Sequence, residues 1–216
     1  LTDMFEAVGG VSSGKVTEAQ LKEMEQVACP GCGACSGMFT ANSMNCLTEV
    51  LGLGLPGNGT IPAVTGKRIA LAKHAGMQVM EMYNKGITAR CMMKEANFRN
   101  ALAADMALGC SSNTILHVPA IAHEAGFELD LHMINEISNK TPNLCHLAPA
   151  GHTFMCQLDD AGGVQAVLAE LAKKNLIDTS VMTVTGKTVA ENIKGVVNRD
   201  PEILRPIENP YSDNGG

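Results

Sequence analysis

Residues 29–60 read CPGCGACSGMFTANSMNCLTEVLGLGLPGNGT, and this stretch decides the local fold. Its cysteines Cys29, Cys32 and Cys35 recur every three residues in a glycine-rich loop. The pattern after the loop predicts a helix that begins with a cap at Ser36. The apolar stripe of that helix consists of Phe39, Met44, Leu47, Val50 and Leu51. Residues 52–59, which include Pro-Gly-Asn-Gly, are expected to form a long turn.

The three cysteines leave several kinds of site open. Closely spaced thiolates are typical of iron–sulfur and zinc sites. A bacterial ferredoxin run would place a fourth cysteine at position 39, which is Phe39. A zinc ribbon would need a second pair of ligands, but Cys46 stands alone, and the histidines do not supply a compact pair. A metal-binding loop and a turn with three free thiols therefore both remain open.

The rest of the chain has a mainly helical pattern. Helices that begin at polar capping residues or end at glycine are predicted over residues 17–27, 65–84, 94–108, 114–125, 130–139 and 162–174. Asp159 or Asp160 is expected to lead into the last of these. Residues 181–184, Val-Met-Thr-Val, are the best strand candidate. Together these patterns predict an α/β fold that is dominated by helices, with no internal domain boundary.

Composition narrows the classes of function. The formal charge of −6, with no run of Lys and Arg, argues against nucleic acid or an anionic membrane surface as a partner. No apolar stretch approaches the roughly 20 residues that span a bilayer. The 13 methionines are read as adaptable core packing, because aromatic residues make up only 3% of the chain. The eight cysteines are sparse outside residues 29–35, which fits a reducing compartment, here the cytoplasm. The chain begins on Leu1 and stops within an apparent turn, so it is expected to be an excerpt from a longer protein.

Other polar groups have two interpretations each. Ser111, Ser112 and Asn113 stand where they could orient a substrate carboxylate at a helix N-terminus, although helix capping is the simpler role. His117 and His123 are six residues apart, which places them on different faces of a helix. Residues 185–188, Thr-Gly-Lys-Thr, lack the earlier glycine and the spacing of a phosphate-binding loop.

A longer match then becomes visible. Residues 29–60 closely resemble the dihydroxy-acid dehydratase branch of a family that also contains 6-phosphogluconate dehydratase and several sugar-acid dehydratases. Further matching stretches lie at residues 3–9, 109–117, 160–164 and 209–216. The resemblance implies that residues 1–216 are part of the N-terminal domain of a larger two-domain enzyme. Residues 201–216, with three prolines, would then be a linker toward the C-terminal domain.

The resemblance also implies a reaction and a cofactor. Such hydro-lyases remove water from 2,3-dihydroxy carboxylates to give 2-keto acids in branched-chain amino-acid biosynthesis. They use a [2Fe–2S] or [4Fe–4S] cluster as Lewis acid, together with Mg²⁺, and they are expected to be homodimers. By motif position Cys35 is the cluster ligand, whereas Cys29 and Cys32 are typical only of this branch.

The remaining parts of the site are expected outside these residues. A Cys-Asp-Lys motif with a cluster thiol and Mg²⁺ ligands would precede Leu1, and the catalytic serine and a Mg²⁺-binding glutamate would follow Gly216. No catalytic residue is therefore expected in the fragment, which alone would be inactive. Two alternatives remain: a sugar-acid or 6-phosphogluconate dehydratase, and a non-catalytic metal-binding module that uses Cys29, Cys32 and Cys35.

Overall fold

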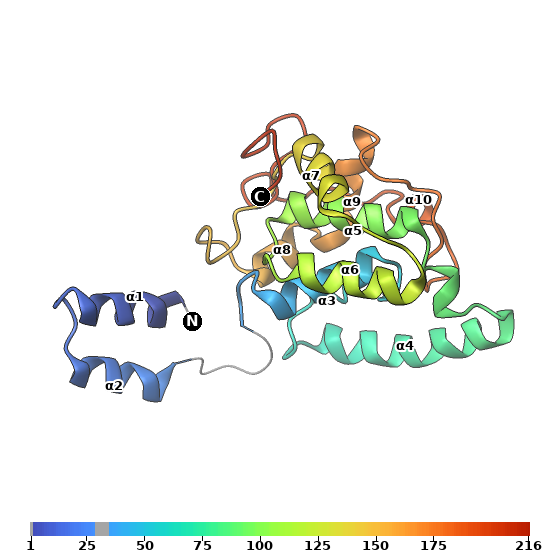
Figure 1. Ribbon diagram of the computed structural model, residues 1–216. Helices are drawn as coiled ribbons and strands as arrows, with labels where there is room; N and C mark the ends of the chain where they lie inside the picture. Colours follow the sequence, from blue (N-terminus) through green and yellow to red (C-terminus); the bar gives the residue numbers. More distant parts are fainter. Residues whose placement is uncertain (1, 29–34) are drawn as a thin grey trace.

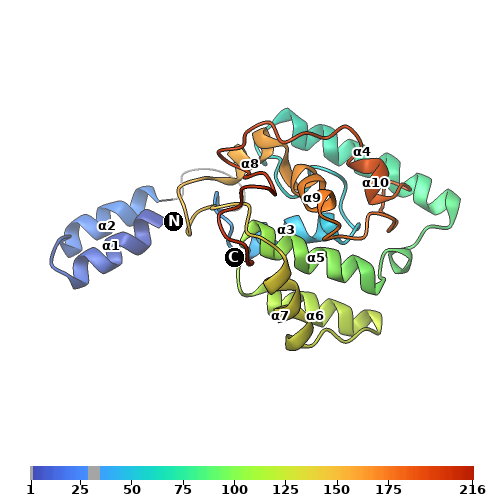
Figure 2. The same ribbon diagram turned by 90° about the horizontal axis from the view of Figure 1, so that it is seen from above.

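The computed structural model describes residues 2–28 and 35–216, and these residues are mainly helical (Figure 1). In chain order the helices are α1 (Thr2–Ser12), α2 (Glu18–Val27), α3 (Thr40–Val50), α4 (Gly66–Lys85), the 3-10 helix η1 (Ala89–Cys91), α5 (Glu95–Leu108), α6 (Thr114–Ala125), α7 (Leu131–Lys140), α8 (Met155–Ala161), α9 (Gly163–Lys173) and α10 (Val189–Asn192). Helices α1 and α2 form a pair beside the remaining helices in both views (Figures 1 and 2).

Helix α5 forms the centre of the core. From Asn97 onward all of its residues except Arg99 are buried. Helices α3, α6, α7 and α9 pack around it (Figure 2). Four of its residues are alanines within the buried stretch, which lets neighbouring helices approach closely. Phe98 is fully buried and lies 6.0 Å, between ring centroids, from Phe127. The core is thus built with few aromatic residues, as the composition predicted.

Buried amides on α5 fix segments that have no regular structure. The Asn97 Nδ2 group donates to the carbonyl of Leu51 at 3.1 Å. The Asn100 side chain donates to the carbonyl of Asp178 at 2.7 Å and accepts from the amide of Asp178 at 2.8 Å. These side chains thus supply hydrogen-bond partners to loop backbone groups that belong to no helix or sheet. They tie the turns after α3 and α9 to the central helix.

Most helix boundaries agree with the capping pattern. The Thr17 hydroxyl accepts from the amide of Gln20 at 3.2 Å, and the Gln20 Oε1 atom accepts from the amide of Thr17 at 2.9 Å. The Asp130 carboxylate accepts from the amide of Met133 at 2.8 Å. Gly86 and Gly109 end their helices with positive φ. The predicted helices over residues 17–27, 65–84, 94–108 and 130–139 are therefore confirmed to within a residue or two.

The predicted cap at Ser36 is wrong. Helix α3 begins at Thr40, and the backbone of Phe39 is extended. The Ser36 carbonyl instead accepts from the amide of Met155 at 2.8 Å. This contact with a residue far along the chain holds residues 35–39 outside the helix. Because a tertiary contact holds these residues, the helix begins only at Thr40.

The expectation for Asp159 and Asp160 is also wrong. Both lie inside the short helix α8, which the sequence pattern did not predict, and Gly162 separates α8 from α9 with φ of 126°. The Asp159 carboxylate accepts from the Thr60 hydroxyl at 2.8 Å and lies 3.3 Å from the Lys67 ammonium. It joins two segments that are distant in sequence instead of capping a helix.

The strand predicted at residues 181–184 is not formed. Among the described residues the only β-type pairings are three isolated bridges, Asn143 with Ser212, Leu147 with Thr153 and Met182 with Thr188. The amide of Thr183 donates to the carbonyl of Lys187, and the amide of Val184 donates to the carbonyl of Gly52. The segment thus bonds to turns instead of to a neighbouring strand. The helix-rich half of the fold prediction is confirmed, while residues 2–28 and 35–216 contain no sheet.

Helix α4 lies along one side of the molecule (Figure 1). Only Gln78 of its 20 residues is buried, and several of its large apolar side chains are exposed, including Ile69, Met77, Met80 and Tyr83. None of the helices in the described part of the chain combines the length and the apolar character needed to cross a bilayer.

Candidate functional site

A cavity of about 400 Å³ lies where the start of α3 meets the start of α6. Met38 and Phe39 line it before α3, and residues 109–112 line it before α6. The loop over residues 143–150 and the terminal Gly216 complete the wall. Cys35 precedes Met38 by three residues, so the predicted cluster ligand belongs to the loop that forms one edge of this cavity.

The Cys35 loop, residues 35–39, is held in place by hydrogen bonds to four of its backbone groups. Two of them are the carbonyls of Cys35 and Gly37, which both accept from the Asn42 side-chain amide. The amide of Met38 donates to the carbonyl of Ala148 at 2.7 Å, and the carbonyl of Ser36 bonds to α8 as described above. A Cβ atom at Gly37 would overlap the Ala148 carbonyl oxygen, so the close approach requires glycine.

Cys35 differs from the thiols around it. Cys35 is partly exposed, whereas Cys145 is buried, and burial raises the pKa of Cys145 to about 12. Burial and the nearby Asp105 carboxylate also raise the pKa of Cys110 well above its usual range. Burial thus disfavours the thiolate form of both cavity-lining thiols. Cys35 is the candidate metal ligand because of its motif position and its place on the loop at the edge of the cavity.

The other two cysteines of the sequence motif, Cys29 and Cys32, lie outside the described residues. Within residues 2–28 and 35–216 there is no group of three His, Cys, Asp or Glu side chains placed to hold a metal ion. Cys35 would thus supply one ligand of a set that these residues do not complete. His117 and His123 are exposed on α6 and belong to no such group.

The polar residues before α6 bind one another across the cavity wall. Asn113 Nδ2 donates to the Thr40 hydroxyl at 2.7 Å and to the Ser111 hydroxyl at 3.1 Å. Thr40 and Ser111 are themselves 3.1 Å apart, and the Ser111 amide donates to the Ser43 hydroxyl at 3.0 Å. Asn113 is the N-cap residue of α6, but its side chain makes no capping hydrogen bond. These side chains therefore join the starts of α3 and α6, which corrects the simple capping role.

His146 is a cavity residue that the sequence pattern did not indicate. It lines the cavity and stacks on the Tyr211 ring, with ring centroids 3.8 Å apart and planes at 12°. The Arg205 guanidinium lies over the same tyrosine, 5.1 Å from its centroid. The stack joins residues that are far apart in the sequence, so no local sequence motif predicts this contact. Tyr211 and Arg205 thus help to place an imidazole ring at the cavity.

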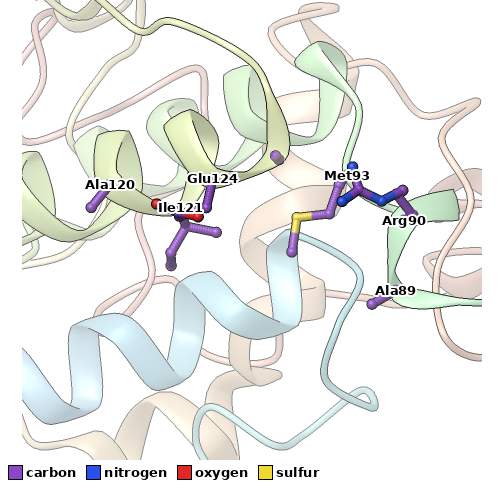
Figure 3. Close-up of a pocket in the computed structure, with 7 residues that line it drawn as sticks. Ala89, Arg90, Met93, Ala120, Ile121 and Glu124 are labelled. Atoms are coloured by element: carbon purple, nitrogen blue, oxygen red, sulfur yellow. The ribbon is translucent and has the colours of Figure 1, made fainter.

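Two further cavities are apolar and lie elsewhere. One, of about 450 Å³, lies between the η1 region and α6, where Ala89 and Met93 face Ala120 and Ile121 (Figure 3). The other, of about 610 Å³, lies beneath α4. Neither is lined by residues of the Cys35 loop. The cavity beside Cys35 is smaller, but polar groups from three segments meet there, so we take it as the candidate site.

Comparison with known proteins gives a consistent result. A model of the dihydroxy-acid/6-phosphogluconate dehydratase N-terminal family matches residues 1–192. The chain is similar to proteins named dihydroxy-acid dehydratase from Lachnoclostridium phytofermentans, at 64% identity over 216 residues, and from Clostridium beijerinckii, at 61% over 216 residues. A third such relative, from Agathobacter rectalis, is 63% identical over 216 residues.

These alignments cover 100% of this chain and 39% of each relative. The family model extends over most of the chain, from the α1–α2 pair to α10, and it includes the Cys35 loop and the cavity residues up to position 150. The chain therefore belongs to the dihydroxy-acid/6-phosphogluconate dehydratase family, within its N-terminal region.

Proposed function

We propose that the complete protein dehydrates 2,3-dihydroxy carboxylates, such as 2,3-dihydroxyisovalerate and 2,3-dihydroxy-3-methylvalerate, in branched-chain amino-acid biosynthesis. The reaction removes the C2 proton and the C3 hydroxyl as water, and the resulting enol tautomerises to a 2-keto acid. The observation that carries this proposal is the identity of 61–64%, over the whole chain, to relatives named dihydroxy-acid dehydratase.

The Cys35 loop offers one thiol ligand to an iron–sulfur cofactor at the edge of the cavity. Cluster iron is bound by thiolates, and Cys35 is the partly exposed thiol on the loop at the edge of the cavity. When bound, the cluster supplies a Lewis-acidic iron for the departing hydroxyl, and Mg²⁺ held by residues outside this chain would stabilise the enolate charge. We assign Cys35 to the cluster and no catalytic acid or base to the described residues.

The chain's own part in the reaction is to hold and orient. Ser111 and Ser112 line the cavity just before α6, where the positive end of the helix dipole favours an anion such as a substrate carboxylate. The contacts among Thr40, Ser111 and Asn113 keep the starts of α3 and α6 together, so a substrate bound there would meet the Cys35 loop in a fixed position.

Several properties of the complete protein are part of the same proposal. The protein would be a cytoplasmic homodimer, and residues 201–216 would lead from a partial N-terminal domain, residues 1–216, to a C-terminal domain. The complete N-terminal domain would be α/β, with its strands contributed by the rest of the polypeptide. The length of the relatives supports the presence of a further domain, because the chain spans only 39% of them.

Single substitutions in the full-length protein, purified without oxygen, test the assignment. We expect Cys35→Ser to abolish both cluster binding and formation of the 2-keto acid from 2,3-dihydroxyisovalerate, because the cluster loses a ligand. Cys32→Ser should retain much of both. Iron and acid-labile sulfide per chain are measured beside the rate of keto-acid formation, and equal losses in the two variants would refute the single-ligand assignment.

The same proteins discriminate the alternatives. A wild-type enzyme that dehydrates 6-phosphogluconate or sugar acids faster than 2,3-dihydroxyisovalerate would identify the sugar-acid branch. A stable cluster that is lost in each of Cys29→Ser, Cys32→Ser and Cys35→Ser, in a protein that dehydrates none of these substrates, would identify a non-catalytic metal-binding module.

A further inference from the structure

Asn42 makes the contacts that most directly control Cys35. It is the third residue of α3, and its side chain is buried, with the residue 8% exposed. The Nδ2 group donates to the carbonyl of Gly37 at 2.7 Å and to the carbonyl of Cys35 itself. Both acceptors are carbonyl oxygens, so the nitrogen of the amide must face them, and both of its hydrogens are used.

This arrangement is opposite to ordinary helix capping. A side chain near a helix N-terminus usually accepts from backbone amides, as Thr17 does at α2. Asn42 instead donates backward, over the start of α3, to two carbonyls of the preceding loop. The bonds hold the peptide group between Cys35 and Ser36 and the one between Gly37 and Met38. The backbone directly after the Cys35 Cα atom is thereby tied to α3.

We propose that Asn42 is a positioning residue for the Cys35 thiolate. This inference rests on the proposed function, in which Cys35 binds the cluster. Groups that orient a metal ligand without touching the metal commonly change metal affinity about 10- to 100-fold when they are removed. Asn42 has this role because it is the side chain that holds the ligand's own carbonyl, while the Ser36 and Met38 contacts hold only its neighbours.

The substitution Asn42→Asp separates hydrogen-bond donation from packing. Aspartate has the same shape, but at neutral pH its carboxylate only accepts hydrogen bonds and would face two carbonyl oxygens. A residue that merely fills space would be replaced by aspartate with little effect on the site. Asn42→Ala serves as a second variant, which removes the donor without adding a charge.

Asn45→Ala is the matched control. Asn45 lies one turn further along α3 and is also partly buried. Its side chain donates to the carbonyl of Asn58 at 3.0 Å and accepts from the Asn58 side-chain amide at 2.7 Å, so it ties α3 to the following turn. It is the same residue type in the same helix, with a comparable number of hydrogen bonds, but these bonds do not involve the Cys35 loop.

The experiment uses the full-length protein with its cluster. The visible absorption of the cluster is followed while a ferrous-iron chelator removes the iron, and the thermal unfolding of each cluster-free protein is recorded in parallel. We expect Asn42→Asp and Asn42→Ala to lose the cluster about 10- to 100-fold faster than wild type. Asn45→Ala should stay within about twofold of wild type. The cluster-free Asn42→Ala and Asn45→Ala proteins should unfold at temperatures similar to each other, because each loses a side chain that makes two hydrogen bonds.

The outcomes are distinct. A cluster retained equally well in wild type and Asn42→Asp overturns the positioning role but leaves the proposed function intact. An equally fast loss in Asn45→Ala also overturns it, because the effect would then belong to α3 as a whole. Failure of both Asn42 variants to fold overturns it as well, since Asn42 would support the fold. Absence of a cluster in wild type overturns the proposed function itself.

Discussion

At the scale of single residues, Asp105 is a carboxylate in an unfavourable environment. It is 4% exposed near the end of α5. Its Oδ2 atom accepts from the Thr114 hydroxyl at 3.0 Å, while Oδ1 has no hydrogen-bond partner in the described part of the chain. Burial raises the pKa of Asp105 from 3.8 to about 6, although the side chains of Thr114 and Cys110 oppose the shift. The folded protein therefore favours the protonated carboxyl.

This shift predicts a specific dependence of stability on pH. Between pH 3.8 and about 6 the folded state holds a proton at Asp105 that the unfolded state has released. The contribution of Asp105 to stability is therefore full below pH 3.8 and is lost as the pH rises through about 6. An asparagine side chain at this position cannot titrate. The free energy of unfolding of Asp105→Asn should therefore rise by about 3 kcal/mol relative to that of wild type between about pH 4 and pH 7.

Urea unfolding of the full-length wild type and Asp105→Asn at several pH values measures this difference. Asp213→Asn is a suitable control, because it makes the same change of residue type at an exposed position. A constant difference between Asp105→Asn and wild type across this pH range would contradict the buried, protonated state of Asp105.

At the scale of elements, Glu49 is the residue that joins α3, the turn after it and α9. Its carboxylate accepts from the amide of Gly57 at 3.1 Å and from the amide of Gly59 at 2.9 Å. It also accepts from the Gln165 side chain at 2.7 Å. Burial raises the pKa of Glu49, and these three hydrogen bonds work against that rise. The glycine-rich turn is thus organised around one buried carboxylate.

Removal of this carboxylate should loosen the turn. We expect Glu49→Ala to lower the free energy of unfolding by about 3 kcal/mol, because the partly buried amide of Gly57 and the buried amide of Gly59 would lose their acceptor. Glu81→Ala is the comparison, since its ion pair with Lys85 is exposed and contributes less than about 1 kcal/mol. Chemical denaturation measures the loss of free energy of unfolding in Glu49→Ala and in Glu81→Ala. Equal losses in the two variants would show that Glu49 does not organise the turn.

At the scale of the whole molecule, α4 carries an exposed apolar face. Met77 and Met80 are 63% and 57% exposed, and Tyr83 is 80% exposed. Gly76 lies at the middle of the helix, and a Cβ atom there would meet no other atom within 4 Å. Exposed apolar side chains that gather on one helix commonly mark a contact surface. We expect this face to be covered in the complete protein.

Methionine oxidation in the full-length protein tests this expectation. Met182 is 40% exposed and lies far along the chain from α4, so it serves as an internal reference. If the α4 face is covered, peroxide should oxidise Met77 and Met80 more slowly than Met182, which reverses the order of their exposures in the chain described here. Faster oxidation of Met77 and Met80, measured by peptide mass spectrometry, would show that the face remains open.

Much of the helical framework was predictable from the sequence, because helix ends depend on nearby residues. Thr17 and Asp130 cap the helices that follow them, and Gly86 and Gly109 end theirs. The family resemblance was equally visible in residues 29–60, since a long motif with fixed spacing needs no structure to be seen. The assignment of Cys35 to a cluster stays a prediction.

The sequence by itself determined most of the helices and the family, because each depends on residues close together in the chain. Only the tertiary structure decided that Ser36 bonds to α8 instead of capping α3, and that residues 181–184 pair with turns instead of a strand. It also placed His146 on Tyr211, and Asn42 beneath the Cys35 loop. These contacts depend on which hydrogen-bonding groups and rings come together when the helices pack. They join residues that are distant in sequence, so the spacing of residues along the chain does not predict them.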